Sequence, residues 1–502
     1  MQNGSLKEAG DGYRPPFDAD EFRRLGHAMV DFIAEYQQSL GTGSLPVRSQ
    51  ASPGYLAPRL PGAAPEQPEG LPAILEDVQR HILPGMTHWQ SPSFFAWFPA
   101  NTSPPSLVAD MLCSALGVIG FSWVSSPAAT ELEAIVLDWL GQLLRLPPSF
   151  LSPQGGTGVI QSTASEATLV ALLSAKARAM EGRPEEDALK LCAYCSDQAH
   201  SSVRKACMVA GITRLRALPT SPEHLHALQP EAIEAAVQAD LAEGLLPCFA
   251  CATIGTTNSC AVDPLPAIGQ LALRHSLWLH VDAAYAGTFG LLPELSSHFE
   301  GLELADSFDT NPHKGLLTNF DCSTMWFREG RARWARQALS LTPEYLRHHA
   351  NDLDYKDLQV PLGRKFRALK LWFVMRMYGA EGLRAYLRNR LECQRVFEEL
   401  LAADSRFLVA EGTAPRFGLV CFRLAGATRQ QSEVVLEAVN ASGTAFLVGT
   451  LMDGQHTIRM AIGSATVLPR HIREAWAAIQ AAADEVLGPV ATSNGAENGL
   501  AH

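Results

Sequence analysis

Residues 264–287 read PLPAIGQLALRHSLWLHVDAAYAG, and this stretch decides the class of fold. Its first half repeats apolar side chains at the spacing of a helix, and its second half contains a short apolar run that is typical of a buried strand. Similar apolar runs, separated by helical patterns, occur at 189–196, 212–220, 246–257 and 322–327. Apolar strands that alternate with helices predict an α/β fold, in which a mostly parallel sheet is covered on both faces.

We expect four parts along the 502 residues. Residues 1–85 form an N-terminal segment with a disordered start and an amphipathic helix from Phe17 to Leu40, whose apolar side needs a partner surface. Residues 86–380 form the large domain that contains the predicted sheet, and residues 381–488 form a smaller α/β domain. The polar, Gly-rich end, residues 489–502, is expected to be a disordered tail.

The composition excludes several classes of protein. The chain has 40 basic and 52 acidic residues, a net charge of −12, and no basic run, so we expect no binding to nucleic acid. No stretch approaches the roughly 20 apolar residues of a membrane span, and the N-terminus lacks the features of a secretory signal. The ten cysteines do not show metal-ligand spacing. They indicate reduced, buried thiols, a cytoplasmic protein and no metal site.

One lysine stands where a charge is costly. Residues 307–320 read SFDTNPHKGLLTNF and place Lys314 between apolar segments, although an isolated buried ammonium is strongly disfavoured. Three other polar sites follow predicted strands: Asp282, His200 and the turn at Ala164-Ser165, which opens a helix. Each has a structural explanation when taken alone, as a capping or hydrogen-bonding residue. Ligands of parallel sheets, however, bind at the carboxyl ends of the strands, where all these residues would meet.

Together, these residues match the needs of pyridoxal phosphate. This cofactor requires an amine for a Schiff base, a carboxylate against its ring nitrogen, a flat group over the ring and an anion site. Lys314 would supply the amine, Asp282 the carboxylate and His200 the flat group. Ala164 and Ser165 would hold the phosphate, because N–H groups at a helix N-terminus favour an anion. A lysine used in this way need not carry an isolated buried charge.

The chain also resembles a known family along 17–487. The motifs that carry the resemblance are THWQSPSFFAWFPA, TASEATLVALL, SDQAHSSV, HVDAAYAG, ADSFDTNPHKG and VPLGRKFRALKLWFVMRMYG. They resemble those of the group II pyridoxal-phosphate decarboxylases, in particular the aromatic L-amino acid decarboxylases. The resemblance implies a fold-type I, aspartate aminotransferase-like architecture and an obligate homodimer. In that dimer the N-terminal segment swaps onto the partner, and the active sites lie at the interface.

The resemblance also implies roles for further residues. It adds four to the cofactor shell: Thr253, Ala284, Asn311 and His313. It places Tyr345, in the segment SLTPEYLRHHANDLDYKDLQVPLG, as the group that returns a proton to the substrate Cα. In related aldehyde synthases phenylalanine is typical at this position, so Tyr345 argues for an enzyme that makes an amine. The implied substrate pocket has Trp97, Phe98 and Pro99 on one wall, Ile119 and Phe121 from the other subunit, and Gly363 beneath the substrate ring.

The pocket favours tryptophan as the substrate and tryptamine as the product. Glycine at 363 leaves room for a two-ring side chain, whereas serine there could meet a phenol. Tyrosine, dopa or phenylalanine decarboxylation, an oxygen-dependent aromatic aldehyde synthase, and a non-catalytic dimeric relative stay open as alternatives. Gly315, Trp97 and Ala100 depart from the usual family pattern. We expect Gly315 to loosen the packing behind the lysine, and the other two to alter the volume and polarity near the substrate.

Overall fold

The computed structural model describes residues 17–341 and 353–488, and the chain divides into two compact units, Met1–His88 and Trp89–His502. The first unit contains the helices α1 (Ala19–Gly41) and α2 (Leu71–Asp77). The carboxylate of Asp18 caps α1 by accepting hydrogen bonds from the backbone N–H groups of Asp20 and Glu21. Phe22 and Val30 on α1 are exposed, as expected for a helix whose apolar side needs a partner.

The second unit is built on a seven-stranded sheet in the order β1-β7-β6-β5-β4-β2-β3. Its strands are β1 (Thr157–Gln161), β2 (Leu191–Ser196), β3 (Arg214–Leu218), β4 (Leu246–Thr253), β5 (Trp278–Asp282), β6 (Ser307–Thr310) and β7 (Ser323–Phe327). Only β7 runs against its neighbours, so the predicted mostly parallel sheet is confirmed. The strand β6 was not predicted, because it has four residues and three of them are polar.

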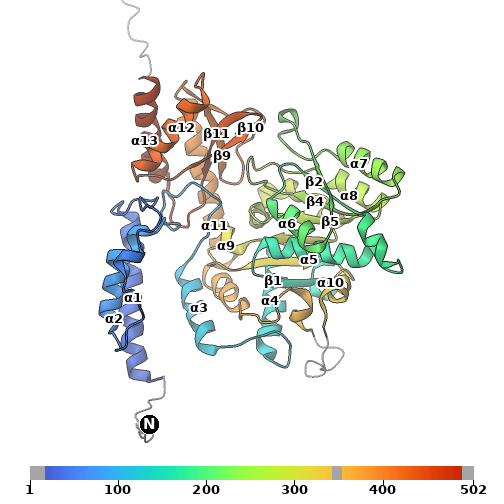
Figure 1. Cartoon of the computed structure of the whole chain (residues 1–502), viewed down its shortest axis with the longest axis horizontal. Coiled ribbons are helices and arrows are strands. Elements are labelled where there is room, and N and C mark those ends of the chain that lie inside the picture. The colour runs from blue at the N-terminus through green and yellow to red at the C-terminus, as the bar shows by residue number, and fades with distance from the viewer. Residues whose placement is uncertain (1–16, 342–352, 489–502) are drawn as a thin grey trace, which may run out of the picture. The chain divides into compact units, whose positions relative to one another are not determined.

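Helices cover both faces of this sheet (Figure 1). On one face lie α5 (Ala164–Ala179), α6 (Ser201–Ala210) and α10 (Ala332–Leu339), and on the other lie α4 (Pro127–Leu143), α7 (Pro230–Ala242) and α8 (Leu265–Arg274). The helices α3 (Pro104–Leu116) and α9 (Pro312–Gly315) complete this part of the unit. No helix in the described ranges is long and apolar enough to cross a membrane.

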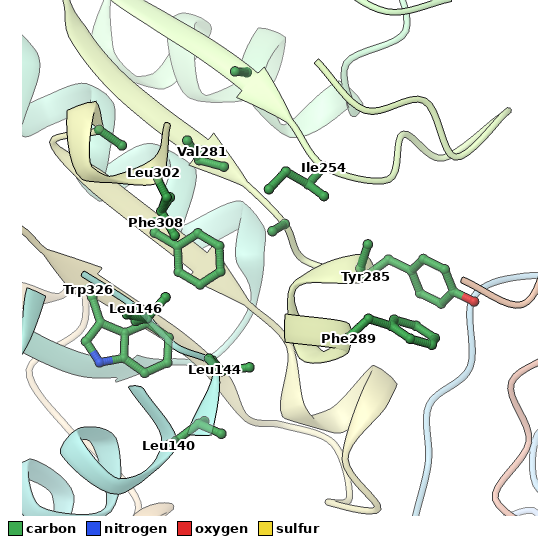
Figure 2. Close-up of a cluster of buried hydrophobic side chains, with 14 of the residues drawn as sticks. Leu140, Leu144, Leu146, Ile254, Val281, Tyr285, Phe289, Leu302, Phe308 and Trp326 are labelled. Carbon is green, nitrogen blue, oxygen red and sulfur yellow. The ribbon is translucent and has the colours of Figure 1, made fainter. Parts of the chain in front are cut away.

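A large hydrophobic cluster lies between the sheet and α4 (Figure 2). Phe308 of β6 and Trp326 of β7 pack with their ring centroids 6.0 Å apart, and both side chains are fully buried. Leu140 and Leu144 approach them from the end of α4. Burying a large apolar side chain contributes about 1.5–3 kcal/mol, so this cluster holds β6 firmly in the sheet. The segment that follows β6 carries Lys314.

A second, four-stranded sheet lies in the C-terminal part, in the order β10-β11-β9-β8. Its strands are β8 (Phe407–Val409), β9 (Leu419–Leu424), β10 (Val448–Met452) and β11 (Gln455–Ala461), and its helices are α11 (Ala368–Ala402), α12 (Arg429–Ala441) and α13 (Pro469–Leu487). The sequence did not predict β8, which has three residues, or β10, in which only Met452 is buried. The expected boundary at 380/381 falls inside α11, next to Gly379, whose φ of 63° interrupts the helix.

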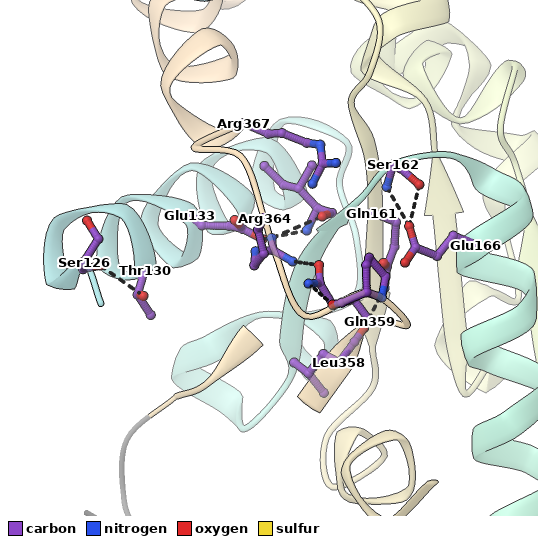
Figure 3. Close-up of polar contacts among 12 residues, drawn as sticks. Ser126, Thr130, Glu133, Gln161, Ser162, Glu166, Leu358, Gln359, Arg364 and Arg367 are labelled. Atoms are coloured by element: carbon purple, nitrogen blue, oxygen red, sulfur yellow. Dashed lines mark hydrogen bonds and ion pairs between the residues drawn. The ribbon is translucent and has the colours of Figure 1, made fainter. Parts of the chain in front are cut away.

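A buried polar network anchors the segment 358–364 to the sheet (Figure 3). The guanidinium of Arg364 donates hydrogen bonds to Glu133 of α4, to the side chain of Gln359 and to the carbonyl of Ile160. The side chain of Gln161, at the end of β1, donates to the carbonyl of Leu358 at 2.7 Å. These contacts therefore fix the position of Gly363, which precedes Arg364.

We expect the substitution Glu133→Ala to destabilise the protein strongly. It would leave the Arg364 charge buried without a counter-ion, which costs about 3–5 kcal/mol. The shift should appear as a lower midpoint of urea unfolding, monitored by tryptophan fluorescence. Glu399→Ala removes an exposed partner of Arg395 on α11 and should leave the midpoint almost unchanged. Equal midpoint shifts in the two variants would contradict this view of the network.

Candidate active site

A cavity of about 210 Å³ lies at the carboxyl ends of the large-sheet strands. It is lined by Phe98, Thr163, Ala164, Ser165, His200, Thr253, Gly255, Thr257, Asp282, Ala284, Tyr285, Asn311, His313, Lys314 and Phe320. The nine residues predicted to surround the cofactor are all in this set. They come from five separate strand ends, so the parallel sheet is what brings them together.

Lys314 stands in the short helix α9, directly after β6. Its backbone N–H donates to the carbonyl of Asn311 at 2.9 Å, and its own carbonyl accepts from the side chain of Asn101 at 2.8 Å. Burial lowers the pKa of the Lys314 amine, and the carboxylates of Asp282 and Asp309 oppose this shift. A lowered pKa increases the fraction of neutral amine, which is the form that attacks a carbonyl carbon.

Asp282 is the last residue of β5, and it is buried. Its Oδ1 accepts a hydrogen bond from the backbone N–H of Ala284 at 3.0 Å, which fixes the direction of the carboxylate. The backbone carbonyl of Asp282 accepts from the N–H of Ile254 on the neighbouring chain segment. The carboxylate is therefore held rigidly in the cavity wall, where it can pair with a protonated ring nitrogen.

Two histidines line the cavity in defined tautomers. His200 precedes α6, and its Nδ1 accepts from the backbone N–H of Ser202 at 3.2 Å. Because Nδ1 is the acceptor in this hydrogen bond, the ring hydrogen is on Nε2. His313 is buried, and its Nδ1 accepts from the N–H of Cys322 at 3.0 Å. Burial, aided by the charge of Lys314, lowers the pKa of His313 to about 3, so that this ring stays neutral.

The N-terminus of α5 forms an anion site in the cavity wall. Thr163 caps the helix, and its side chain accepts a hydrogen bond from the N–H of Glu166. The N–H groups of Ala164 and Ser165 belong to the first turn, so they have no acceptor within the helix. Because these donors and the helix dipole point towards the cavity, the turn suits a phosphate group.

The residues present fit pyridoxal phosphate. The buried side-chain oxygens Thr253 Oγ1 and Asn311 Oδ1 have no hydrogen-bond partner among the described residues, although both belong to the cavity lining. Unpaired buried polar atoms are rare, and here a polar ligand would satisfy them. An amine, a carboxylate, an imidazole and a helix N-terminus also surround the same space. The donor set therefore matches the cofactor's aldehyde, ring nitrogen, ring face and phosphate.

The predicted substrate residues do not all lie at this cavity. Phe98 lines it, with its ring stacked on Tyr285 at a centroid distance of 3.4 Å. Trp97 instead packs against Trp89 and Phe446, each at a centroid distance of 5.3 Å. Neither Trp97 nor Pro99 is part of the lining, since the chain bends at residues 96–98 and turns these side chains elsewhere.

Ile119, Phe121 and Gly363 form a separate group. A Cβ atom added to Gly363 would lie 3.7 Å from Ile119 Cγ2, and the N–H of Gly120 donates to the carbonyl of Arg364 at 3.1 Å. Ile119 is 59% exposed, which is an unusually high exposure for an isoleucine. This group does not line the cavity of its own chain. Tyr345 lies outside the described residues.

Five lining residues were not predicted: Thr163, Gly255, Thr257, Tyr285 and Phe320. Most of them lie at the ends of the same strands as the predicted residues. Their place at a strand end could have identified them from the sequence. The expected loose packing at Gly315 is wrong. A Cβ atom there would lie 2.0 Å from Thr288 Oγ1, so Thr288 fills the space behind the lysine.

Comparisons with known proteins agree with this site. Residues 53–425 match the model of the pyridoxal-dependent decarboxylase conserved domain. Tryptophan decarboxylase 2 of Oryza sativa subsp. japonica is 46% identical over 491 residues, which cover 95% of this chain and 98% of that protein. Phenylacetaldehyde synthase of Arabidopsis thaliana is 46% identical over 500 residues, covering 97% of this chain and 100% of that protein.

A solved structure extends the likeness to three dimensions. Tryptophan decarboxylase of Catharanthus roseus, in complex with L-tryptophan, superposes with a TM-score of 0.89. It is 40% identical, and the match covers 94% of this chain and 100% of that one. The predicted fold-type I architecture, the cofactor and the carboxy-lyase class are thus confirmed. The chain belongs to the pyridoxal-dependent decarboxylases, within the family of the aromatic L-amino acid decarboxylases.

Proposed function

We propose that the enzyme removes the α-carboxyl group of an aromatic L-amino acid, with tryptophan preferred, and releases CO₂ and the arylalkylamine. The observation that carries this proposal is the cavity around Lys314. It joins a desolvated amine and a buried carboxylate to an aromatic wall made by Phe98 and Tyr285. An aromatic wall suits a flat substrate side chain.

Four parts of the cavity have distinct tasks in this proposal. When bound, pyridoxal phosphate supplies the electron sink for the bond that breaks at Cα. Lys314 would hold the cofactor covalently, and Asp282 would pair with its ring nitrogen. The first turn of α5 binds the phosphate, and His200 covers the ring. The residues of the cavity would also have to orient the substrate so that its carboxylate is the group that leaves Cα.

The proton that replaces the lost carboxyl group comes from Tyr345 in this proposal. Where the described chain resumes after Tyr345, the N–H of Lys356 donates to the carbonyl of Phe121 at 2.9 Å. Lys356 is itself held by Asp354 and Asp357. These contacts hold residues 354–357 beside Phe121.

A homodimer with shared active sites would complete the pocket. Large apolar side chains are exposed along α3 and the segment after it: Val108, Met111, Leu112, Leu116, Ile119 and Val124. So large an exposed apolar set is typical of an interface with another chain. A second copy on this face would bring its own Ile119, Phe121 and Gly363 to the cavity around Lys314. The exposed apolar side of α1 supports a swapped N-terminal segment.

The cysteines support a cytoplasmic location. All ten are buried and free, which agrees with a reducing compartment in which no disulfide is required.

An aldehyde synthase is the second candidate, because one of the relatives above is such an enzyme. A tyrosine at position 345 can deliver a proton to Cα, whereas a phenylalanine cannot. The amine therefore remains the favoured product.

We expect the purified enzyme, offered tryptophan, tyrosine, dopa and phenylalanine together, to release CO₂ and an equal amount of arylalkylamine, chiefly tryptamine. Mass spectrometry identifies the products. Borohydride reduction followed by peptide mapping should place the cofactor on Lys314, and Lys314→Ala should lose the label and the yellow colour. Cofactor binding without turnover of any of the four amino acids would contradict the proposal, as would a label on another residue.

Tyr345→Phe should reduce amine formation by at least about tenfold, because proton delivery by a positioned acid contributes about 10²–10⁴-fold. Aldehyde, ammonia and peroxide should increase in return, and oxygen uptake measured with an electrode would report this change. The nearby Tyr355 is fully buried under Arg364, so Tyr355→Phe serves as a control for loss of a tyrosine hydroxyl. An unchanged product ratio in Tyr345→Phe would remove Tyr345 from the reaction.

Gly363→Ser should shift the preference from tryptophan towards tyrosine. The added Cβ meets Ile119 at an ordinary contact distance of 3.7 Å, so the variant should fold normally. The loss of space should lower kcat/KM for tryptophan by about 10-fold or more relative to tyrosine, as for one methylene in a tight pocket. Gly62→Ser, in the first compact unit, where an added Cβ atom would meet nothing within 4 Å, is the matched control. An equal loss for both substrates would argue against a specificity role.

A further inference from the structure

Asp309 is a second carboxyl group beside Asp282, and the reaction described above does not use it. The two aspartates are paired in the register of the parallel strands β5 and β6. Paired residues of neighbouring strands stand side by side on one face, because strands lie about 4.8 Å apart. Asp309 is fully buried, and neither of its carboxyl oxygens has a hydrogen-bond partner among the described residues. A buried carboxylate in this state is costly to ionise.

His280 is the neighbour of Asp309 that can share a proton with it. Its Nε2 lies 3.3 Å from Asp309 Oδ1, within ion-pair distance, and both side chains are fully buried. On the other side of the ring, Nδ1 lies 2.9 Å from the hydroxyl oxygen of Ser307. The same oxygen accepts a hydrogen bond from Trp278 Nε1 at 2.9 Å. A chain of polar groups thus runs from Asp309 into the sheet.

This series of hydrogen-bonding groups can accommodate both protonation states of Asp309. When Asp309 carries a proton, His280 can face it with the lone pair of Nε2 and donate from Nδ1 to Ser307. When Asp309 is ionised, the Ser307 hydroxyl can turn and donate to Nδ1, so that Nε2–H faces the carboxylate. Between the two states one proton leaves overall: the Asp309 proton passes to Nε2 of His280, the Nδ1 proton is released, and the Ser307 hydroxyl rotates, with no movement of heavy atoms.

The charge of Asp309 interacts with the amine of Lys314 and with other ionisable groups nearby. In the described part of the chain, the ionisable groups that face it are Asp282 and His280 on β5, Lys314 on α9 and Cys251 on β4. The helix α5 and the strand β7 contribute apolar side chains to this face. Burial and the charge of Asp282 raise the pKa of Asp309 to about 7, although His280 and Lys314 oppose the shift.

We propose that Asp309 is a positioning residue that stores a proton behind Asp282 and thereby sets the charge felt by the nitrogen of Lys314. While Asp309 holds its proton, Asp282 provides the negative charge of this wall. Once Asp309 ionises, a second negative charge faces the lysine nitrogen and stabilises its protonated form. Ionisation of Asp309 therefore raises the pKa of the lysine amine. The inference rests on the proposed role of Lys314.

The direct test measures the titration of the Lys314 amine in the full-length protein after removal of the cofactor. Competitive labelling with acetic anhydride from about pH 6 to pH 10, followed by peptide mass spectrometry, reports the neutral fraction of this amine. Asp309→Asn should lower its apparent pKa by about one unit, since one charge at close range is lost. Asp309→Ser differs in volume but is equally neutral, so it should give the same shift. Asp187→Asn removes a carboxylate that pairs with Lys190, and should give none.

The cofactor-free protein offers a second readout through its stability. Because the folded chain keeps the Asp309 proton up to about pH 7 whereas the unfolded chain loses it near pH 3.8, stability falls as pH rises between these values. Asp309→Asn should lack this part of the fall. The midpoint of urea unfolding of Asp309→Asn minus that of the unaltered enzyme should therefore be more positive at about pH 8 than at about pH 5. Asp187→Asn should keep the slope of the unaltered enzyme.

Two results would overturn the inference: an unchanged Lys314 titration in both neutral variants, or a stability slope that Asp309→Asn leaves intact. A shift in Asp309→Asn that is absent from Asp309→Ser would also overturn it, because the cause would then be packing and not charge. Failure of the proposed function is distinguishable. A borohydride label away from Lys314 would remove the lysine's role, while the labelling experiment would still report how Asp309 affects its amine.

Discussion

The burial of one amine against carboxylates is the constraint on which this structure depends. Lys314 sits where desolvation disfavours its charge, and Asp282 and Asp309 partly restore it. That balance exists only because β5 and β6 are neighbours in register, and because α9 begins directly after β6. The hydrophobic cluster of Phe308 and Trp326 keeps β6 in place. The hydrophobic core of the large sheet therefore also holds the Lys314 amine in its position.

Much of this arrangement could be predicted from residues alone. Asp282, His200 and the turn at Ala164-Ser165 each follow an apolar run, and the carboxyl ends of parallel strands meet at one edge of a sheet. Lys314 was conspicuous because a lysine among apolar segments is energetically unfavourable. The cofactor and the reaction class followed from the chemistry of these groups together with the family motifs, and the comparisons confirm both.

Other features depend on register and side-chain direction, which local patterns do not carry. The strands β6, β8 and β10 are short or only partly buried, so they lack the apolar run that marks a buried strand. The direction of Trp97 away from the cavity follows from its packing on Trp89 and Phe446. Likewise, Thr288 fills the space beside Gly315 although 27 positions separate the two in the chain (315 − 288). The pairing of Asp309 with His280 could be recognised only once the strand order was known.

The hydrogen bond from Lys356 to Phe121 bears on whether two different defective subunits can restore activity when they are produced together. It ties the segment after Tyr345 to the group that, in the proposed dimer, serves the cavity of the opposite subunit. If Tyr345 acts across the interface in the same way, two defective genes could complement each other. Co-expression of a subunit without Lys314 and a subunit without Tyr345 would yield mixed dimers that contain one intact site and one doubly defective site. Activity would then return to about a quarter of normal, because half of the randomly assembled dimers are mixed and each has one working site of two.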